Sequence, residues 1–135
     1  MRSTTLTPSG DVPQSSIKQI RILVVEDHTP TRMAMTTLIR STGAEVVAAR
    51  NGEEALCHLL ATRFDVLLTD LKMPVMDGFE LLHNCRTLPD SRRPGRIIAI
   101  SGEYEAGALR GQTVVFLTKP FNIDALLKTL SGLPN

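Results

Sequence analysis

Short runs of apolar residues, many of them β-branched, recur along the chain and predict five strands. Four of the runs are continuous, which is typical of strands buried on both faces of a parallel sheet. The second run is more mixed and is expected at a sheet edge. The runs are QIRILVVE (19–26), AEVVAA (44–49), FDVLLTD (64–70), GRIIAIS (95–101) and TVVFLTK (113–119).

Between these runs, apolar residues recur at helical spacing and predict four helices. The first opens at Pro30 and ends at Gly43, which are usual positions for Pro and Gly at helix ends. The others cover GEEALCHLLAT (52–62), GFELLHNCRT (78–87) and NIDALLKTL, the last capped by Asn122. The residues expected to face inward are Ala34, Met35, Leu38, Ile39, Ala55, Leu56, Leu59, Leu60, Phe79, Leu82 and Cys85.

This alternation predicts an α/β fold in which helices cover both faces of a parallel sheet and the crossovers are right-handed. In such sheets the site lies beyond the carboxyl ends of the strands, where the strand order reverses. Polar residues follow the last apolar residue of four strands. They are Glu26 and Asp27, then Asp70, then Ser101, then Thr118 and Lys119.

Three carboxylates, a hydroxyl and an ammonium group are therefore expected at one edge of the sheet. Carboxylates that lie close together repel one another unless a cation sits among them. Hard oxygen ligands suit Mg²⁺, which also takes phosphate oxygens. Lys119 is able to hold a phosphoryl oxygen, and Ser101 offers a hydroxyl donor. The combination suits a phosphoryl group on a carboxylate, with Asp70 as the nucleophile that forms an aspartyl phosphate.

Composition narrows the class of protein. The 135 residues suit one domain, with a flexible tail over 1–17 and a folded domain over 18–135. A net charge of +1 and few aromatic residues argue against direct nucleic-acid binding. The sequence has no apolar run long enough to span a bilayer and no secretory signal. Cys57 and Cys85 are interpreted as reduced core thiols of a cytosolic protein.

The segments ILVVEDH, DVLLTDLKMPVMDG, IIAISG and LTKPF have the order and spacing of a known family. The chain resembles the receiver domain of two-component response regulators from about Gln19 to Leu130. The resemblance implies a flavodoxin-like, doubly wound sheet of five strands in the order 2-1-3-4-5. It also implies a Lys119–Pro120 peptide bond that is usually cis in the family.

The resemblance implies a role for each candidate residue. Asp70 matches the phosphoacceptor, Asp27 the direct metal ligand and Glu26 the second acid, which acts through water. The backbone carbonyl of Lys72 matches a third metal ligand. Ser101 matches the switch hydroxyl, Lys119 the phosphoryl-binding lysine and Phe116 the aromatic residue that changes rotamer. Asp77 is not counted as a ligand, and His28, His58 and His83 are expected on the surface.

The resulting expectation is a cytoplasmic phosphorylation switch and not an enzyme in the metabolic sense. A histidine kinase or phosphotransfer protein gives a phosphoryl group to Asp70 with Mg²⁺ or Mn²⁺ present, and a downstream protein reads the result. One alternative is a degenerate receiver that binds partners without phosphorylation. Another is a phosphohydrolase with an Asp nucleophile, which is disfavoured because Lys72 stands where such enzymes place a second acid. A stand-alone regulator and a receiver from a hybrid kinase both remain open.

Two features concern this chain in particular. Only GEYEAGALRGQT (102–113) is available for the family's fourth helix and its loops, and it contains three glycines. We therefore expect that helix to be shortened or disordered. Lys72 and Glu103 occupy positions that flank the attacking water in the family, so they either pair and tune the phosphoryl lifetime or remain solvated.

Overall fold

The structure is a computed structural model that describes residues 20–71, 73, 75–101, 115–118 and 123–131. Its elements are, in chain order, β1 (Arg21–Val25), α2 (Thr29–Arg40), β2 (Glu45–Ala49), α3 (Gly52–Ala61), β3 (Val66–Asp70), α4 (Gly78–Arg86), β4 (Arg96–Ser101), β5 (Val115–Thr118) and α5 (Ile123–Ser131). The predictions for the tail, for segment 102–113, and for Lys72, Glu103, Lys119, Pro120 and Asn122 lie outside the described residues.

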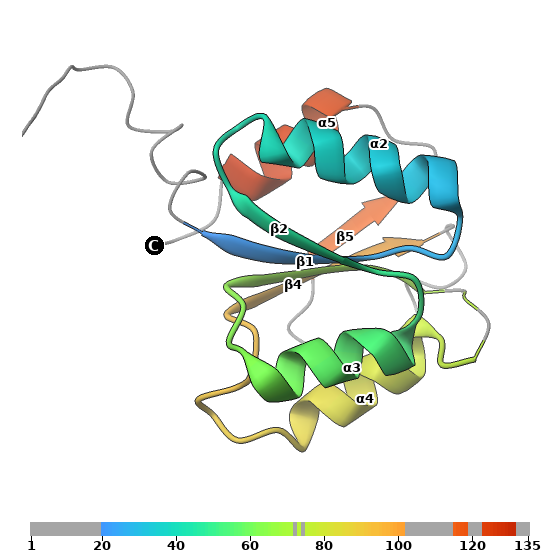
Figure 1. The fold of residues 1–135 in the computed structure, drawn as a ribbon, viewed down its shortest axis with the longest axis vertical. Coiled ribbons are helices and arrows are strands. Elements are labelled where there is room, and N and C mark those ends of the chain that lie inside the picture. Colours follow the sequence, from blue (N-terminus) through green and yellow to red (C-terminus); the bar gives the residue numbers. More distant parts are fainter. Residues whose placement is uncertain (1–19, 72, 74, 102–114, 119–122, 132–135) are drawn as a thin grey trace, which may run out of the picture.

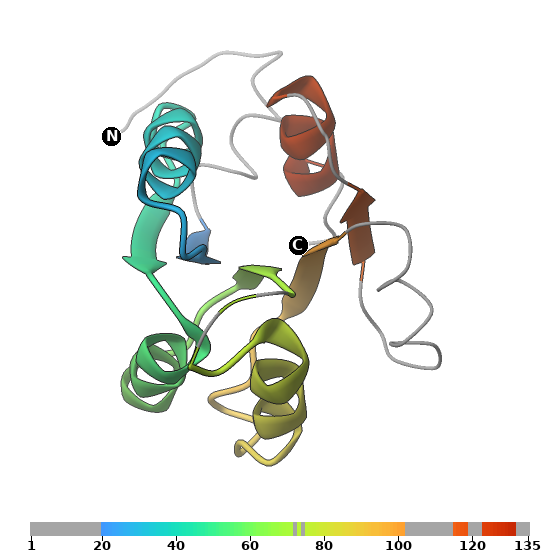
Figure 2. The ribbon, with the colours of Figure 1, turned by 90° about the vertical axis from the view of Figure 1, so that its right-hand side faces the viewer.

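The five strands form one parallel sheet in the order β2-β1-β3-β4-β5, which confirms the predicted order and the edge position of β2. Helices α2 and α5 cover one face of the sheet, and α3 and α4 cover the other (Figures 1 and 2). The chain turns to opposite sides after β1 and β3, which are neighbours. The strand order therefore reverses between them, and their carboxyl ends lie at the edge where a site is expected.

Strand alternation divides the core into two clusters. Along β1, Leu23 and Val25 join the cluster under α3 and α4, whereas Ile22 and Val24 join the cluster under α2 and α5. All four side chains are fully buried because helices cover both faces of the sheet. This is the packing that the continuous apolar runs predict.

The predicted inward faces of α2 and α3 were only partly correct. Met35 and Ile39 are buried as expected, but Ala34 and Leu38 are exposed. On α3, Ala55 and Leu59 are buried and Leu56 is partly buried, whereas Cys57 and Leu60 are exposed, so Cys57 is not a core thiol. The sheet covers only one side of each helix, and adjacent residues in a helix point about 100° apart. The apolar residues of these helices extend beyond the covered side.

The ends of several helices follow from identifiable residues. The helix α2 begins beside Pro30, and Gly43 adopts a positive φ of 97° three residues after the helix ends. Asn51 and Asp77 cap α3 and α4 by accepting hydrogen bonds from the N–H groups of Glu54 and Glu80.

Among the described segments, no helix is both long and apolar enough to cross a membrane.

Candidate metal and phosphorylation site

Three acidic side chains meet at the carboxyl ends of β1 and β3. Because Val25 pairs with Thr69 in the register of these strands, Glu26 and Asp27 come next to the end of the strand that carries Asp70. One carboxylate oxygen from each of the three acids lies within 4.8 Å of the others. The sequence predicted this cluster, and the structure brings all three residues together.

Burial divides the three acids. Glu26 and Asp70 are only 3% and 4% exposed, whereas Asp27 is exposed. Carboxylates this close repel one another, and the repulsion costs more where water is excluded. Three hard oxygen ligands with solvent on one side fit Mg²⁺, which favours carboxylates and keeps part of its water shell.

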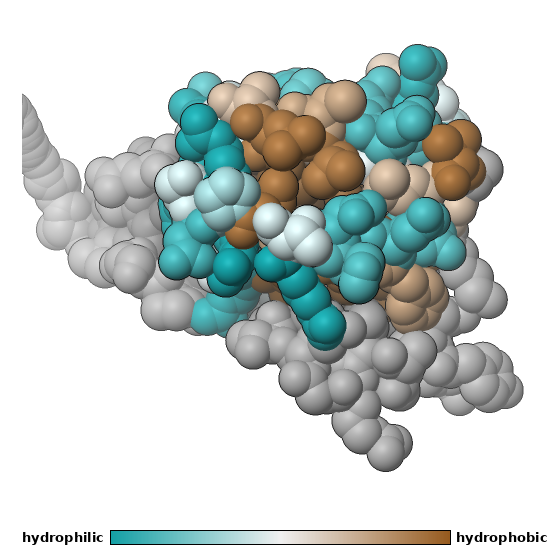
Figure 3. Space-filling model, turned by 90° about the horizontal axis from the view of Figure 1, so that it is seen from below, coloured by the Kyte–Doolittle hydropathy of each residue, from teal (hydrophilic) through white to brown (hydrophobic). Residues whose placement is uncertain are grey.

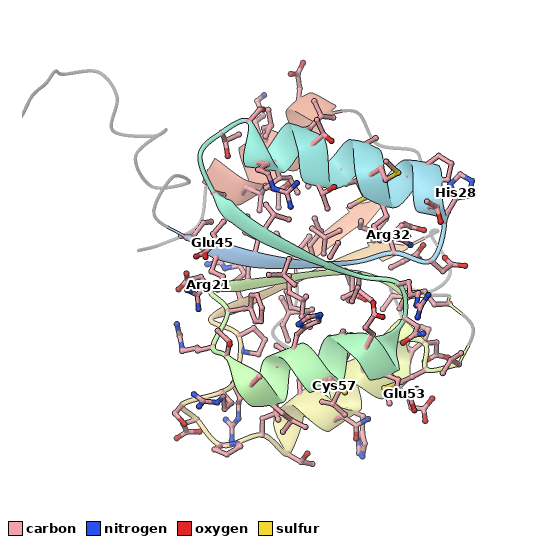
Figure 4. The ribbon with its side chains drawn as sticks, in the orientation of Figure 1. Arg21, His28, Arg32, Glu45, Glu53 and Cys57 are labelled. Atoms are coloured by element: carbon pink, nitrogen blue, oxygen red, sulfur yellow. The ribbon has the colours of Figure 1, made fainter. Side chains whose placement is uncertain are left out.

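The loop that carries Glu26 and Asp27 is held by a residue that the sequence analysis did not identify. Arg32, in the first turn of α2, reaches back and donates a hydrogen bond to the carbonyl oxygen of Glu26 at 2.8 Å (Figure 4). The N–H of His28 donates to the Glu26 carboxylate at 3.1 Å. An Arg five residues after Asp27, on the opening turn of a helix, is the only sequence signal for this contact.

The three histidines and Asp77 lie outside the acid cluster. His28 is exposed, as predicted (Figure 4). Its Nδ1 lies 2.6 Å from the hydroxyl of Thr31. His83 is exposed and His58 is half-buried. Asp77 caps α4, and the acid cluster consists of Glu26, Asp27 and Asp70 without it.

The loop after Asp70 is anchored to α3 and α4. The N–H of Gly52 donates to the carbonyl of Met76 at 3.0 Å, and the N–H of Gly78 donates to the carbonyl of Leu71 at 2.9 Å. Both approaches require glycine. A Cβ on Gly52 would lie 2.6 Å from the Met76 carbonyl oxygen, and one on Gly78 would clash with the carbonyl oxygen of Asp70. The two glycines thus set how closely this loop packs beside the acids.

The remaining predicted residues are placed by backbone register alone or are not described. Asp70 pairs with Ile100, so Ser101 follows directly beyond that pair at the end of β4. Ser101 pairs in turn with Thr118, and Ala99 pairs with Phe116. The roles of Ser101 and Phe116 therefore stay predictions. So do those of Lys72, Glu103 and Lys119, which lie outside the described residues.

Comparison with known proteins identifies the class of protein that this fold and site define. Residues 22–131 match the response regulator receiver domain, and the chain belongs to that family. It is 35% identical over 108 residues to a response regulator receiver protein of an Anaeromyxobacter species. It is 34% identical over 137 residues to the virulence sensor protein BvgS of Bordetella pertussis. The chain spans only 45% and 11% of the lengths of these two relatives.

Solved structures share the fold. The chemotaxis response regulator CheY4 of Vibrio cholerae superimposes with a TM-score of 0.73 at 34% identity, covering 82% of this chain and 95% of that one. The receiver domain of a sensor histidine kinase of Pseudomonas aeruginosa gives a TM-score of 0.72 at 26% identity, covering 84% and 98%. That second structure has a magnesium ion coordinated in its active site cleft.

Proposed function

We propose that this chain is a phosphorylation switch in which Asp70 accepts a phosphoryl group in the presence of Mg²⁺. The observation that carries the proposal is the cluster of Glu26, Asp27 and Asp70, with carboxylate oxygens within 4.8 Å of one another. The cluster lies where the strand order of the sheet reverses, which is the usual place for a site in this class of fold. Membership of the receiver family supports the same assignment.

The carboxylates bind the metal ion, and one of them, Asp70, is also the nucleophile. Glu26, Asp27 and Asp70 would hold the metal ion, together with the backbone carbonyl of Lys72. The ion, when bound, neutralises charge on the carboxylates and on the incoming phosphoryl oxygens. An oxygen of Asp70 attacks phosphorus and forms the O–P bond. The N–P bond of a phosphohistidine donor breaks, and the donor's imidazole leaves as the neutral base after taking up a proton. Mn²⁺ has similar ligand preferences and is expected to substitute.

Three further residues respond to phosphorylation of Asp70. Lys119 binds a phosphoryl oxygen, Ser101 donates a hydrogen bond to it, and Phe116 changes rotamer as the population shifts between two states. Lys72 and Glu103 tune access of the attacking water. The chain catalyses only its own phosphorylation and dephosphorylation.

The proposed partners are a histidine kinase or phosphotransfer protein as donor and a downstream protein as target. Similarity to a response regulator receiver protein and to the sensor protein BvgS supports a donor of this kind. A cytoplasmic location would give such a donor access to Asp70.

Incubation with acetyl phosphate, followed by intact-protein mass spectrometry, tests the proposal. We expect the wild type to gain one phosphoryl group with Mg²⁺ and none with EDTA, and Asp70→Asn to gain none. Asp77→Asn is the matched control, because Asn also caps helices and Asp77 is outside the acid cluster. Equal labelling of wild type and Asp70→Asn would reject the assignment. A wild type that is folded, binds Mg²⁺ and takes no label would favour a binding module that works without phosphorylation.

A further inference from the structure

Helix α3 carries an apolar stripe on its outer surface. Cys57, Leu60 and Ala61 are exposed there, and Leu60 is 57% exposed. With Glu53 they follow the spacing i, i+4, i+7 and i+8, so they lie on one side of the helix. Seen from below, the molecule shows apolar side chains gathered over this region, surrounded by hydrophilic ones (Figure 3). Cys57, Leu60 and Ala61 therefore form an exposed apolar stripe, with Glu53 exposed at its N-terminal end.

The two ends of the stripe have opposite charge. Glu53 lies at the N-terminal end, on the surface of α3 that also carries Cys57 (Figure 4). Arg92 lies at the C-terminal end, where its Nε donates a hydrogen bond to the carbonyl of Leu60 at 3.3 Å. Neighbouring charges are already paired, Arg50 with Glu54 and Arg63 with Asp65. Glu53 and Arg92 form no ion pair with any other residue that the structure describes.

We propose that the stripe pairs with the same stripe of a second copy of this chain, with the two α3 helices antiparallel. A twofold interface requires a surface that is complementary to itself. Antiparallel pairing about a twofold axis near Cys57 places Leu60 against the apolar middle of the other copy. It also brings each Glu53 toward Arg92 of the second copy, so both end charges gain a partner. The helix dipoles are then opposed, which is also favourable.

A second copy of this chain is the expected partner, because the stripe is complementary to itself. A partner of one charge sign would satisfy one end of the stripe and be repelled by the other, whereas a second copy satisfies both. The helix has 10 residues and is therefore about 15 Å long. Stable interfaces bury roughly 1,200–2,000 Å², so a seam of this length predicts weak, concentration-dependent association.

Sedimentation equilibrium on the full chain over rising concentration is the first test. We expect a reversible monomer–dimer equilibrium in the wild type and its loss in Leu60→Glu. Met33→Glu is the matched control, because Met33 is 61% exposed on α2, on the other face of the sheet. Its dimerisation should equal that of the wild type. A wild type that remains monomeric up to about 1 mM, or equal effects of the two substitutions, would overturn the proposal.

A charge exchange tests the antiparallel arrangement. Glu53→Arg and Arg92→Glu should each weaken the dimer by about tenfold, because each reversal leaves two like-charged contacts. The double variant should return to within about threefold of the wild-type dissociation constant. Circular dichroism and thermal midpoints of all variants confirm folding. No recovery in a folded double variant would reject antiparallel pairing.

The native cysteines give a third test. Cys57 is exposed on the stripe, whereas Cys85 is buried and its pKa is raised by that burial to about 11, so it is expected to be unreactive. A short bismaleimide should link wild-type chains into dimers through Cys57. Linking should persist in Cys85→Ala, and should be lost in Cys57→Ser and in Leu60→Glu, which keeps both cysteines. Equal linking of wild type and Leu60→Glu would show that the cross-links arise from random collisions, and it would overturn the proposed α3 interface.

Discussion

Val75 adopts a φ of 72°, a left-handed conformation that is costly for a β-branched side chain. Val75 is 73% exposed, so little packing offsets this cost. We expect Val75→Asn to raise the free energy of unfolding by about 1 kcal/mol, because Asn tolerates this conformation better. Urea denaturation measures the change, and Val75→Ala, which keeps a Cβ but is not Asn-like, serves as the control. An unchanged or lower midpoint for the Asn variant would contradict the strain.

Cys85 makes the free energy of unfolding depend on pH in the alkaline range. Burial raises the pKa of its thiol from 9.0 to about 11, so the folded protein keeps a proton that the unfolded chain loses. The contribution to stability is complete below pH 9 and is lost as the pH rises from 9 to 11. It amounts to roughly 2 to 3 kcal/mol over that range.

Urea denaturation of wild type and Cys85→Ala at several pH values isolates this contribution from that of other titrating groups. We expect the wild type to lose more stability between pH 9 and pH 11 than the variant does. Parallel pH profiles would show that the thiol ionises equally in both states.

At the scale of elements, α3 and the loop after β3 are joined by the contact of Gly52 with Met76. Gly52→Ala places a Cβ 2.6 Å from a backbone oxygen, so the loop or the helix must move. We expect a loss of about 1 to 3 kcal/mol in unfolding free energy and weaker Mg²⁺ binding. Urea denaturation and calorimetric Mg²⁺ titration measure the two effects.

Gly95→Ala is the matched control for this contact. Its Cβ would meet the carbonyl of Asp65 at 3.1 Å, near the start of β4 and so at the opposite end of the sheet from the acids. Mg²⁺ affinity should therefore stay at the wild-type value. Equal losses of affinity in the two variants would point to general destabilisation in place of loop positioning.

The sequence predicted the positions of the helices and strands more accurately than it predicted which side of each helix is buried. Strand positions and the acids at strand ends were predictable because continuous apolar runs stop at Glu26 and Asp70. The exposure of Leu38, Leu60 and Cys57 was not predictable, because the sequence of a helix with apolar residues on several sides does not reveal which side the sheet covers. Contacts such as Arg32 with the Glu26 carbonyl and Gly52 with Met76 depend on how loops meet in the fold. Local sequence patterns carry little information about such contacts.

For the whole molecule, the acid cluster implies that the metal-free fold carries an electrostatic cost that Mg²⁺ removes. We expect MgCl₂ at a hundredfold excess over its Kd to stabilise the wild type by about 2.7 kcal/mol relative to NaCl of equal ionic strength. Asp27→Asn should be more stable than the wild type without metal and should lose most of the Mg²⁺ effect. Thermal unfolding with and without EDTA measures both. An equal response of the two proteins to Mg²⁺ would place the ion elsewhere.

Locating the phosphoryl group on the chain tests directly whether Asp70 is the phosphoacceptor. Borohydride reduces an aspartyl phosphate to homoserine, which peptide mass spectrometry assigns to a single residue. After treatment with acetyl phosphate and Mg²⁺, we predict homoserine at position 70, and unmodified aspartate at positions 27 and 77 and at position 70 of an EDTA-treated sample. Homoserine at another aspartate would show that Asp70 is not the phosphoacceptor, and homoserine at position 70 in equal amounts with EDTA would show that phosphorylation does not need Mg²⁺.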